Sequence, residues 1–340
     1  MKIKISPFNQ KNILITGGTG SLGKALTYHL LKYYTPNTIR ILSRDEMKQW
    51  EMKKHFSSLD KKGLLRFFLG DVREKSRLHR AFENVDIVIH AAALKQVPAC
   101  EYNPIEAIRT NIEGAINVID AALDNEVEKI IALSTDKASQ PVNLYGATKL
   151  CSDKLFINAN NYRGFKKTAF SVVRYGNVIG SRGSVVPLFT EQAQSGVLTI
   201  TDKEMTRFWI TLSEAVKFII SSLEIMQGGE LFVPKIPSMK LLDLVRAIAP
   251  NAKLVVSGIR PGEKLHESLI SSDEARNTID LGDRYVIQPE NVMVWNPKHY
   301  KNTKPVDRDF SYYSQNNTDF LSTTEMKEKI KQASYEDNSL

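Results

Sequence analysis

Asn12-Ile-Leu-Ile-Thr16 leads directly into Gly17-Gly-Thr-Gly20-Ser-Leu-Gly23 near the start of this 340-residue chain. The first five residues form a short, mostly apolar run, which is typical of a buried strand. The spaced glycines that follow permit a tight turn and a close approach of the backbone to a ligand. A helix beginning after them would present free N–H groups to a pyrophosphate. Because the glycines stand between a strand and a helix, the stretch predicts a dinucleotide-binding α/β domain.

Strands and helices continue to alternate through the first half of the chain. Short apolar runs are separated by stretches with helical spacing, such as 105–124. This alternation predicts a parallel, doubly wound sheet with helices on both faces, which explains why the strands are almost wholly apolar. Further strands are predicted at 38–43, 65–69, 85–90, 129–134 and 170–174.

The pattern loosens after Tyr175. Residues 176–206 are rich in Gly, Ser and Thr, which is typical of loops around a ligand, whereas 208–225 predicts a helix and 230–233 a strand. We expect 332–340 to be a frayed terminus. The predicted fold is a Rossmann-type sheet with a smaller, interleaved C-terminal substrate-binding domain. The predicted division is 1–176 plus a returning segment at about 207–234 for the first domain, 177–206 and 235–290 for the substrate-binding lobe, and 291–340 for a C-terminal extension.

Ser43-Arg-Asp45 follows the second predicted strand, about 20 residues beyond the glycines. An acid at this place binds the ribose 2′-hydroxyl of NAD, whereas an arginine accommodates the 2′-phosphate of NADP. Arg44 comes first, which favours NADP over NAD; the alternative is an Arg–Asp surface pair without a cofactor. We interpret His90 as a packed or supporting histidine. The predicted cofactor set is Thr16, Gly17, Gly20, Ser21, Leu22, Gly23, Ser43, Arg44, Asp45, Lys48, Asp71, Val72, Ala91, Ala92, Ala93, Lys95, Asn111, Tyr145 and Lys149.

A candidate catalytic set lies around the fifth predicted strand. Tyr145 and Lys149 are four residues apart, so they share one helical face, and a neighbouring ammonium favours the phenolate. Thr135 adds a hydroxyl, while Asp136 and Lys137 add an acid and an amine. An alcohol dehydrogenase does not need that extra pair, but an enzyme that also eliminates water does.

The elimination requires an acid and a base near the same two carbons. We expect Lys137 to be the base, with a pKa lowered by burial and by Lys149, and Asp136 to be the acid. The reverse assignment stays open, because Tyr145 could supply a proton to the opposite face. Adjacent side chains on a strand point apart, so a turn is expected at 134–138.

With the glycine motif, Thr135, Tyr145 and Lys149 in place, the chain resembles an extended short-chain dehydrogenase/reductase. Longer strings are more specific, and they are His90-Ala-Ala-Ala-Leu-Lys-Gln-Val-Pro98, Ser134-Thr-Asp-Lys-Ala138, Arg174-Tyr-Gly-Asn-Val-Ile-Gly-Ser-Arg-Gly-Ser-Val-Val-Pro187, Met205-Thr-Arg-Phe-Trp-Ile210 and Gly258-Ile-Arg-Pro-Gly-Glu-Lys-Leu-His-Glu267. The chain closely resembles the soluble, inverting UDP-N-acetylglucosamine 4,6-dehydratases that open the pseudaminic acid pathway and feed flagellin glycosylation in some bacteria. Retaining dehydratases carry Glu where Lys137 stands.

The resemblance implies an NADP-dependent lyase that acts on UDP-N-acetylglucosamine as a cytoplasmic homo-oligomer, a hexamer. It implies that Thr135, Tyr145 and Lys149 form the hydroxyl–Tyr–Lys set and that Asp136 and Lys137 are catalytic. Arg182 matches a loop position near the sugar nucleotide. The substrate-binding residues that we expect are Lys95, Asn177, Val185, Thr206, Met239, Arg260 and Glu263.

Three other functions fit parts of the pattern. A UDP-sugar C4 epimerase would use the same fold and Tyr–Lys pair without needing Asp136 and Lys137. A retaining nucleotide-sugar 4,6-dehydratase and a non-catalytic NADPH-sensing protein are the other two. The complete set of Thr135, Tyr145 and Lys149 argues against the last.

Composition narrows the function classes further. The net charge is +8, but the basic residues are scattered among acids, so we predict no nucleic-acid partner. No apolar run reaches the length of a signal peptide or a membrane span, so a cytoplasmic protein without a membrane partner is expected. Cys100 and Cys151 lack metal-ligand spacing and predict two reduced thiols without a metal site.

Overall fold

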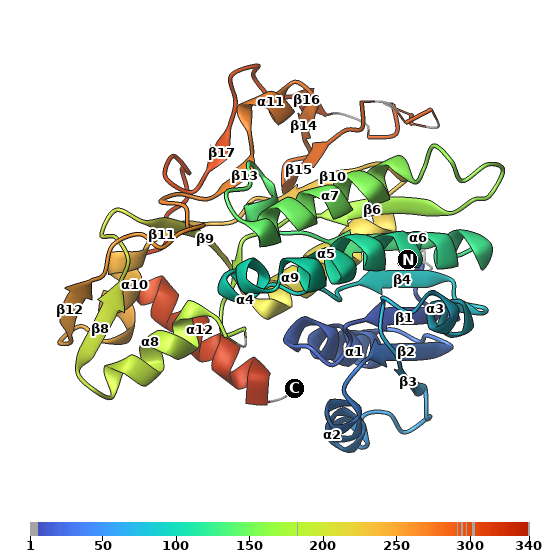
Figure 1. Cartoon of the computed structure of the whole chain (residues 1–340), viewed down its shortest axis with the longest axis horizontal. Helices are drawn as coiled ribbons and strands as arrows, with labels where there is room; N and C mark the ends of the chain where they lie inside the picture. Colours follow the sequence, from blue (N-terminus) through green and yellow to red (C-terminus); the bar gives the residue numbers. More distant parts are fainter. Residues whose placement is uncertain are drawn as a thin grey trace, which may run out of the picture.

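The computed structural model describes residues 6–338 apart from 182, 291, 294, 297, 301 and 302, with side chains up to Ser334. The larger lobe contains a ten-stranded sheet in the order β16-β14-β15-β10-β6-β5-β4-β1-β2-β3 (Figure 1). The strands from β3 to β10 across this sheet are all parallel, which confirms the predicted doubly wound sheet. They are β1 (Asn12–Thr16), β2 (Thr38–Ser43), β3 (Leu65–Leu69), β4 (Ile87–His90), β5 (Lys129–Leu133), β6 (Ala169–Val173) and β10 (Leu231–Pro234).

Helices cover this sheet in two layers and enclose the main hydrophobic core. Helix α1 packs against α9 in one layer, while α3, α6 and α7 pack together in the other (Figure 1). Since both faces are covered, β1, β4, β5 and β6 are buried almost throughout. The helices are α1 (Ser21–Tyr33), α2 (Glu46–Phe56), α3 (Lys75–Phe82), α6 (Gly114–Asp124), α7 (Leu144–Asn158) and α9 (Leu212–Ile225).

The predicted domain boundaries need a correction at the β10 edge of the sheet. Strand β15 (Arg284–Ile287) pairs antiparallel with β10, followed by β14 (Thr278–Asp280) and β16 (Lys304–Pro305). Residues assigned to the second lobe and to the C-terminal extension thus complete the main sheet. An antiparallel strand satisfies the backbone groups that β10 would otherwise leave unpaired, but such short strands carry little periodicity.

The smaller lobe has its own hydrophobic core and two small sheets (Figure 1). Residues 206–210, predicted partly as helix, form a strand because they pair with strands on both sides. The helix begins only after Thr211, which makes a capping box with Glu214. The region 176–206 is more ordered than predicted. The elements are β7 (Asn177–Val178), α8 (Val185–Ala193), β8 (Val197–Ile200), β9 (Thr206–Ile210), β11 (Ser238–Lys240), α10 (Leu241–Ile248) and β12 (Lys253–Val256).

The C-terminal helix α12 (Thr323–Asn338) packs on α10 and reaches α9. The frayed end predicted from 332 onward is therefore wrong, since the helix continues to Asn338. Met326 is fully buried in the second core, and the Lys329 ammonium lies 2.7 Å from the Glu214 carboxylate. Tertiary packing thus stabilises a segment whose sequence is polar and weakly periodic.

The remaining elements connect the two lobes or border the site. The helix predicted at 105–124 is interrupted by a π-helical turn at Arg109–Glu113. Within the described part of the chain, no helix has the length and apolar character needed to cross a membrane. The remaining elements are α4 (Val97–Tyr102), α5 (Pro104–Ile108), a 3₁₀ turn (Asp136–Ala138), β13 (Ser268–Ile270), α11 (Ser272–Ala275) and β17 (Tyr312–Tyr313).

Candidate active site

The glycine-rich loop joins β1 to α1 and lies against the end of β4. Gly17 has φ +65°, and a Cβ built there would meet the Ala92 nitrogen at 2.8 Å, so a side chain would prevent the loop from lying this close to the residues after β4. Gly20 is the N-cap of α1, without a side-chain cap and without an acid in the first turn. The N–H groups at this helix start therefore suit a pyrophosphate, and the loop fits the predicted dinucleotide.

Thr16 and His90 join the ends of β1 and β4. The Thr16 hydroxyl lies 2.8 Å from His90 Nδ1 and accepts a hydrogen bond from the Ala92 N–H at 3.3 Å. Burial, and then the charge of Lys149, lower the pKa of His90 to about 3. The imidazole is thus neutral and packed, which confirms the prediction for His90.

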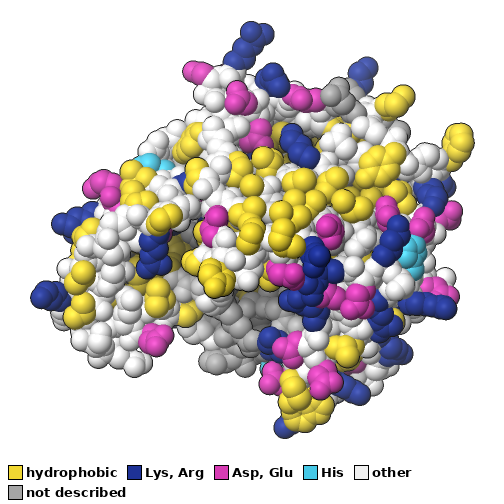
Figure 2. All heavy atoms as spheres, viewed as in Figure 1, with side chains coloured by type: hydrophobic (Ala, Val, Ile, Leu, Met, Phe, Trp, Pro, Cys, Tyr) yellow, Lys and Arg dark blue, Asp and Glu magenta, His cyan; other side chains and the backbone are white. Residues whose placement is uncertain are grey.

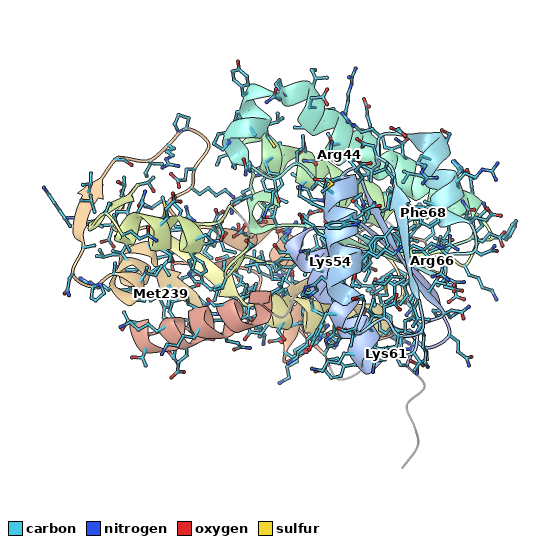
Figure 3. All side chains as sticks on the ribbon, turned by 90° about the horizontal axis from the view of Figure 1, so that it is seen from below. Arg44, Lys54, Lys61, Arg66, Phe68 and Met239 are labelled. Carbon is cyan, nitrogen blue, oxygen red and sulfur yellow. The ribbon has the colours of Figure 1, made fainter. Side chains whose placement is uncertain are left out.

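After β2, Asp45 caps the next helix and the Arg44 side chain is exposed to solvent. Asp45 caps α2 by accepting a hydrogen bond from the Lys48 N–H at 3.0 Å, and its carboxylate lies 2.7 Å from the Lys48 ammonium. Arg44, labelled in Figure 3 beside α2, has 54% of its side chain exposed, and its nearest acid is Asp71 at 3.5 Å. Asp45 is therefore committed to the helix, whereas the Arg44 guanidinium is accessible. Ser43, by contrast, is buried, and its hydroxyl accepts a hydrogen bond from Gln49 at 3.2 Å.

Asp71 and Asn111 fix the loops that follow β3 and β4. Burial alone would raise the pKa of Asp71, but hydrogen bonds and charge from Arg73 hold it below its usual value. Asn111, on the π-helical turn, accepts a hydrogen bond from the Leu94 N–H at 2.8 Å and donates to the Leu94 carbonyl and the Thr148 hydroxyl. The Asn111 amide is therefore occupied within the protein and supports the loop that carries Ala91–Ala93.

Tyr145 and Lys149 lie on the first turns of α7, which Asn143 caps. A Cβ at Gly146 would overlap the Lys137 carbonyl oxygen, so this glycine lets α7 approach the 3₁₀ turn closely. Burial raises the pKa of Tyr145 to about 12, against the lowering effects of Lys137 and Thr135. The expectation that Lys149 would bring this pKa toward neutrality is not met, because burial outweighs the effects that lower it. Burial also lowers the pKa of Lys149 itself, against the charge of Asp153.

Asp136 and Lys137 form a hydrogen-bonded pair at the end of β5. The predicted turn is confirmed: Thr135 caps the 3₁₀ turn and donates to Asp136 Oδ1 at 2.9 Å. Lys137 Nζ donates to the same oxygen at 3.0 Å. Asp136 is fully buried, and its Oδ2 has no hydrogen-bond partner among the described residues.

Glu267, which the predicted site omits, is the second carboxylate at Lys137. Its Oε1 lies 3.2 Å from Lys137 Nζ and 3.8 Å from Arg207 Nε, and its Oε2 lies 3.9 Å from Lys264 Nζ. Burial would raise the pKa of Glu267, but these three cations lower it. The signal was present in the sequence, since Glu267 ends the string that carries Arg260 and Glu263.

The two carboxylates correct the expected protonation of Lys137. Burial would lower its pKa, but Asp136 and Glu267 outweigh burial and raise it well above the usual value. The pKa of Asp136 is raised by burial and by Glu267, against the effect of Lys137. The side chain of Lys137 is thus an ammonium in this arrangement, and Lys149 does not depress its pKa as predicted.

Of the predicted substrate-binding residues, Thr206 and Met239 are buried, and the others are at least partly exposed. Glu263 accepts a hydrogen bond from the Arg260 N–H at 3.2 Å and lies 3.9 Å from Arg207, while the Arg260 side chain is exposed. Burial, and then the charge of Lys137, lower the pKa of Lys95, which places it near the pair. Asn177 and Val185 are half-buried on the first residues of β7 and α8, and Arg182 lies outside the described residues.

Two side chains of the predicted substrate set are used inside the fold. The Thr206 hydroxyl is buried and lies 2.8 Å from His266 Nδ1 and 2.7 Å from the Ser314 hydroxyl. Met239, labelled in the smaller lobe in Figure 3, is fully buried in the second core. Its side chain therefore has no exposed atom to offer a substrate.

Cys100 is buried and Cys151 is half-buried, and both are free thiols. Across the described ranges, no group of three or more His, Cys, Asp or Glu side chains is placed to hold a metal ion.

Comparison with known proteins places this geometry in a family. The chain is 55% identical over 332 residues, 95% of its length and 98% of the relative, to a UDP-N-acetylglucosamine 4,6-dehydratase (inverting) of Campylobacter jejuni. It is 40% identical to a UDP-glucose 4-epimerase of Rickettsia canadensis over 96% of its length and 97% of the relative. The X-ray structure of Pen from Bacillus thuringiensis superposes with a TM-score of 0.88 and 38% identity over 98% of this chain and 99% of that one. The family model described as "Polysaccharide biosynthesis protein" matches residues 13–289, and the chain therefore belongs to that family.

Proposed function

We propose that the protein is a UDP-N-acetylglucosamine 4,6-dehydratase that inverts C5, giving UDP-2-acetamido-2,6-dideoxy-β-L-arabino-hex-4-ulose. The observation that carries the proposal is the Asp136–Lys137 pair, hydrogen-bonded at 3.0 Å beside Tyr145 in one buried site. Simple hydride transfer has no use for an additional acid and amine, whereas elimination of water has. The Campylobacter jejuni relative bears that activity in its name.

NADP is the proposed cofactor, and when bound it would supply a reversible hydride acceptor for C4 and C6 of the sugar. The start of α1 would hold its pyrophosphate, since no side chain caps the N–H groups there and no acid stands in the first turn. The exposed guanidinium of Arg44 would pair with the 2′-phosphate, because Asp45 is already used as a helix cap.

Tyr145 would act on the 4-hydroxyl group. As its phenolate it would remove the hydroxyl proton, and the positive charge of Lys137 and the Thr135 hydroxyl favour that form against the effect of burial. The resulting 4-ketone acidifies the hydrogen on C5.

Asp136 and Lys137 would then carry out the elimination as a pair. The Lys137 ammonium passes a proton to Asp136 across their 3.0 Å hydrogen bond, which gives a neutral amine and a carboxylic acid. Lys137 takes the C5 proton, and Asp136 gives its proton to the departing 6-hydroxyl. The original ion pair is restored, and one molecule of water has left. Tyr145 returns a proton to C5 from the opposite face, which inverts that carbon.

The same proposal extends to the substrate contacts and the cellular setting. Arg260 and Glu263 would bind the UDP moiety. Lys95, Asn177 and Val185 would face the sugar. Thr206 and Met239 could contribute only through their backbones. The reaction would be the first step of pseudaminic acid synthesis, in the cytoplasm, for flagellin glycosylation.

The proposal includes a homo-oligomer, a hexamer by family resemblance, and an exposed hydrophobic band supports self-association. Figure 2 shows hydrophobic side chains gathered over α5 and α6, where Ile105 and Ile116 are exposed, and Tyr102 on the adjacent α4 is also exposed. Contiguous apolar surface of this kind marks association sites.

Proton NMR of the protein incubated with UDP-N-acetylglucosamine tests the function directly. A new 6-methyl doublet marks dehydration, and the ring couplings report the configuration at C5. A C4 epimer without a methyl signal would instead establish a C4 epimerase, the activity that the Rickettsia canadensis relative bears in its name. A methyl signal with the D configuration at C5 would establish a retaining dehydratase, and no turnover would favour the NADPH-sensing protein.

A further inference from the structure

Glu267 is a buried carboxylate for which the mechanism above has no role. It is 2% exposed, and it approaches Lys137 from the residue just before β13, far along the chain from the 3₁₀ turn at Asp136–Ala138. We propose that Glu267 is a positioning residue that holds the Lys137 ammonium beside Asp136, an inference that rests on the proposed function. Lys137 Nζ lies 3.2 Å from Glu267 Oε1 and 3.0 Å from Asp136 Oδ1, so both carboxylates contact the ammonium.

The segment carrying Glu267 is fastened to the catalytic turn along its length. Asn143 Nδ2 donates to the Gly262 carbonyl at 2.8 Å, and Lys264 Nζ donates to the Ser139 carbonyl at 2.6 Å. The hydroxyls of Ser139 and Ser268 lie 3.0 Å apart. Glu267 is therefore anchored by its backbone, whereas Lys137 ends a flexible four-carbon chain. In this pair the glutamate is the fixed member and the lysine the adjustable one.

Arg207 and Lys264 also lie near the second carboxylate, Arg207 at the same oxygen as Lys137 and Lys264 at the other oxygen. Arg207 donates to the Thr206 and Leu265 carbonyls at 2.7 and 3.0 Å, so its guanidinium is fixed as well. Two cations near Glu267 limit the cost of burying its charge, which allows a second carboxylate at the site. Without Glu267, Asp136 alone would direct Nζ.

The location of Glu267 also links nucleotide recognition to the chemistry. Arg260 and Glu263, the proposed UDP contacts, stand at the start of the same segment that ends with Glu267. Binding energy from the nucleotide can therefore be used to place Lys137 at C5, which is how remote contacts raise the rate of a chemical step.

Single-turnover experiments on Glu267→Gln, with NADP and UDP-N-acetylglucosamine in deuterated water, separate positioning from other effects. NADPH absorbance reports C4 oxidation, and mass spectrometry reports deuterium at C5. In the single turnover we expect the rate of C4 oxidation to match wild type, while the C5 exchange rate falls about 100-fold, the loss that a misplacement of about 1 Å causes. Steady-state assays should show an unchanged KM and a kcat that is lower by the same factor. Glu267→Asp keeps the carboxylate and should recover part of the exchange rate.

Asp273→Asn is the matched control, because it makes the same charge change at an exposed position on the neighbouring α11. It should exchange C5 at the wild-type rate. Wild-type exchange in Glu267→Gln would overturn the inference, and so would equal losses of C4 oxidation and C5 exchange. An absence of dehydration in the wild-type protein would instead refute the proposed function.

Discussion

Replacing Lys137 by methionine should destabilise the protein in a pH-dependent way. The change keeps the length of the side chain but removes the cation that hydrogen-bonds Asp136 at 3.0 Å. Asp136 is fully buried, and in the described structure its remaining side-chain hydrogen bond comes from the Thr135 hydroxyl. Glu267 keeps Arg207 and Lys264 within 3.9 Å, so the cost falls mainly on Asp136.

The expected loss is about 3 kcal/mol in the free energy of unfolding at pH 8. Removing one partner of a buried ion pair costs about 3–5 kcal/mol, and the lower value applies because 23% of the Lys137 side chain is exposed to screening water. Burial and Glu267 already raise the pKa of Asp136, and loss of Lys137 raises it further. A raised carboxyl pKa destabilises the folded state above that pKa, and the cost disappears as pH falls toward the unfolded value of 3.8. The deficit should therefore be smaller at pH 5 than at pH 8.

Urea denaturation followed by tryptophan fluorescence at both pH values measures this loss. Lys240→Met is the matched control, since the exposed Lys240–Glu204 pair at 2.8 Å should change stability by less than about 1 kcal/mol. The double variant Asp136→Asn/Lys137→Met, which removes both charges, should recover most of the loss. A deficit under about 1 kcal/mol at pH 8, or one that does not shrink at pH 5, would refute the reasoning.

Three further predictions concern the reaction. Arg44→Ala should weaken NADP binding by about 1.5–3 kcal/mol, tenfold or more, with little effect on NAD; calorimetric titration with both cofactors measures this, and equal losses would contradict it. Tyr145→Phe should bind the UDP-sugar normally yet form no NADPH in a single turnover, and normal NADPH formation would exclude Tyr145 as the base. Lys137→Ala should oxidise C4 but incorporate no deuterium at C5, whereas Asp136→Asn should exchange C5 and lose water slowly. Wild-type exchange in Lys137→Ala would make Asp136 the first candidate for the base.

Local signals were sufficient for much of the sheet and for the core of the site. Each of the six predicted strands from 12–16 to 170–174 matches an observed strand within two residues, because a strand buried on both faces must be continuously apolar. The glycine loop and the Tyr145–Lys149 spacing were equally readable, since each depends on residues within one or two turns of backbone. The turn at Asp136 followed from the need to aim two adjacent side chains into one site.

Other features depend on contacts between distant parts of the chain. Strands β14, β15 and β16 are short, and their place at the sheet edge is set by pairing with β10 rather than by their own sequence. Residues 208–210 were predicted as helix, but they belong to a strand at 206–210 that two partner strands hold.

The ionisation of the site was the property that sequence could least reveal. Near neighbours of Lys137 in the sequence suggested a lowered pKa, because burial and Lys149 both act in that direction. The fold instead brings Glu267, 130 positions further along the numbering, to 3.2 Å from Nζ, and this carboxylate with Asp136 raises the pKa. Residue type and spacing thus determined which groups are present, whereas the tertiary structure decided their charges. The reason is that a buried charge responds to every other charge within a few ångströms, whatever its distance along the chain.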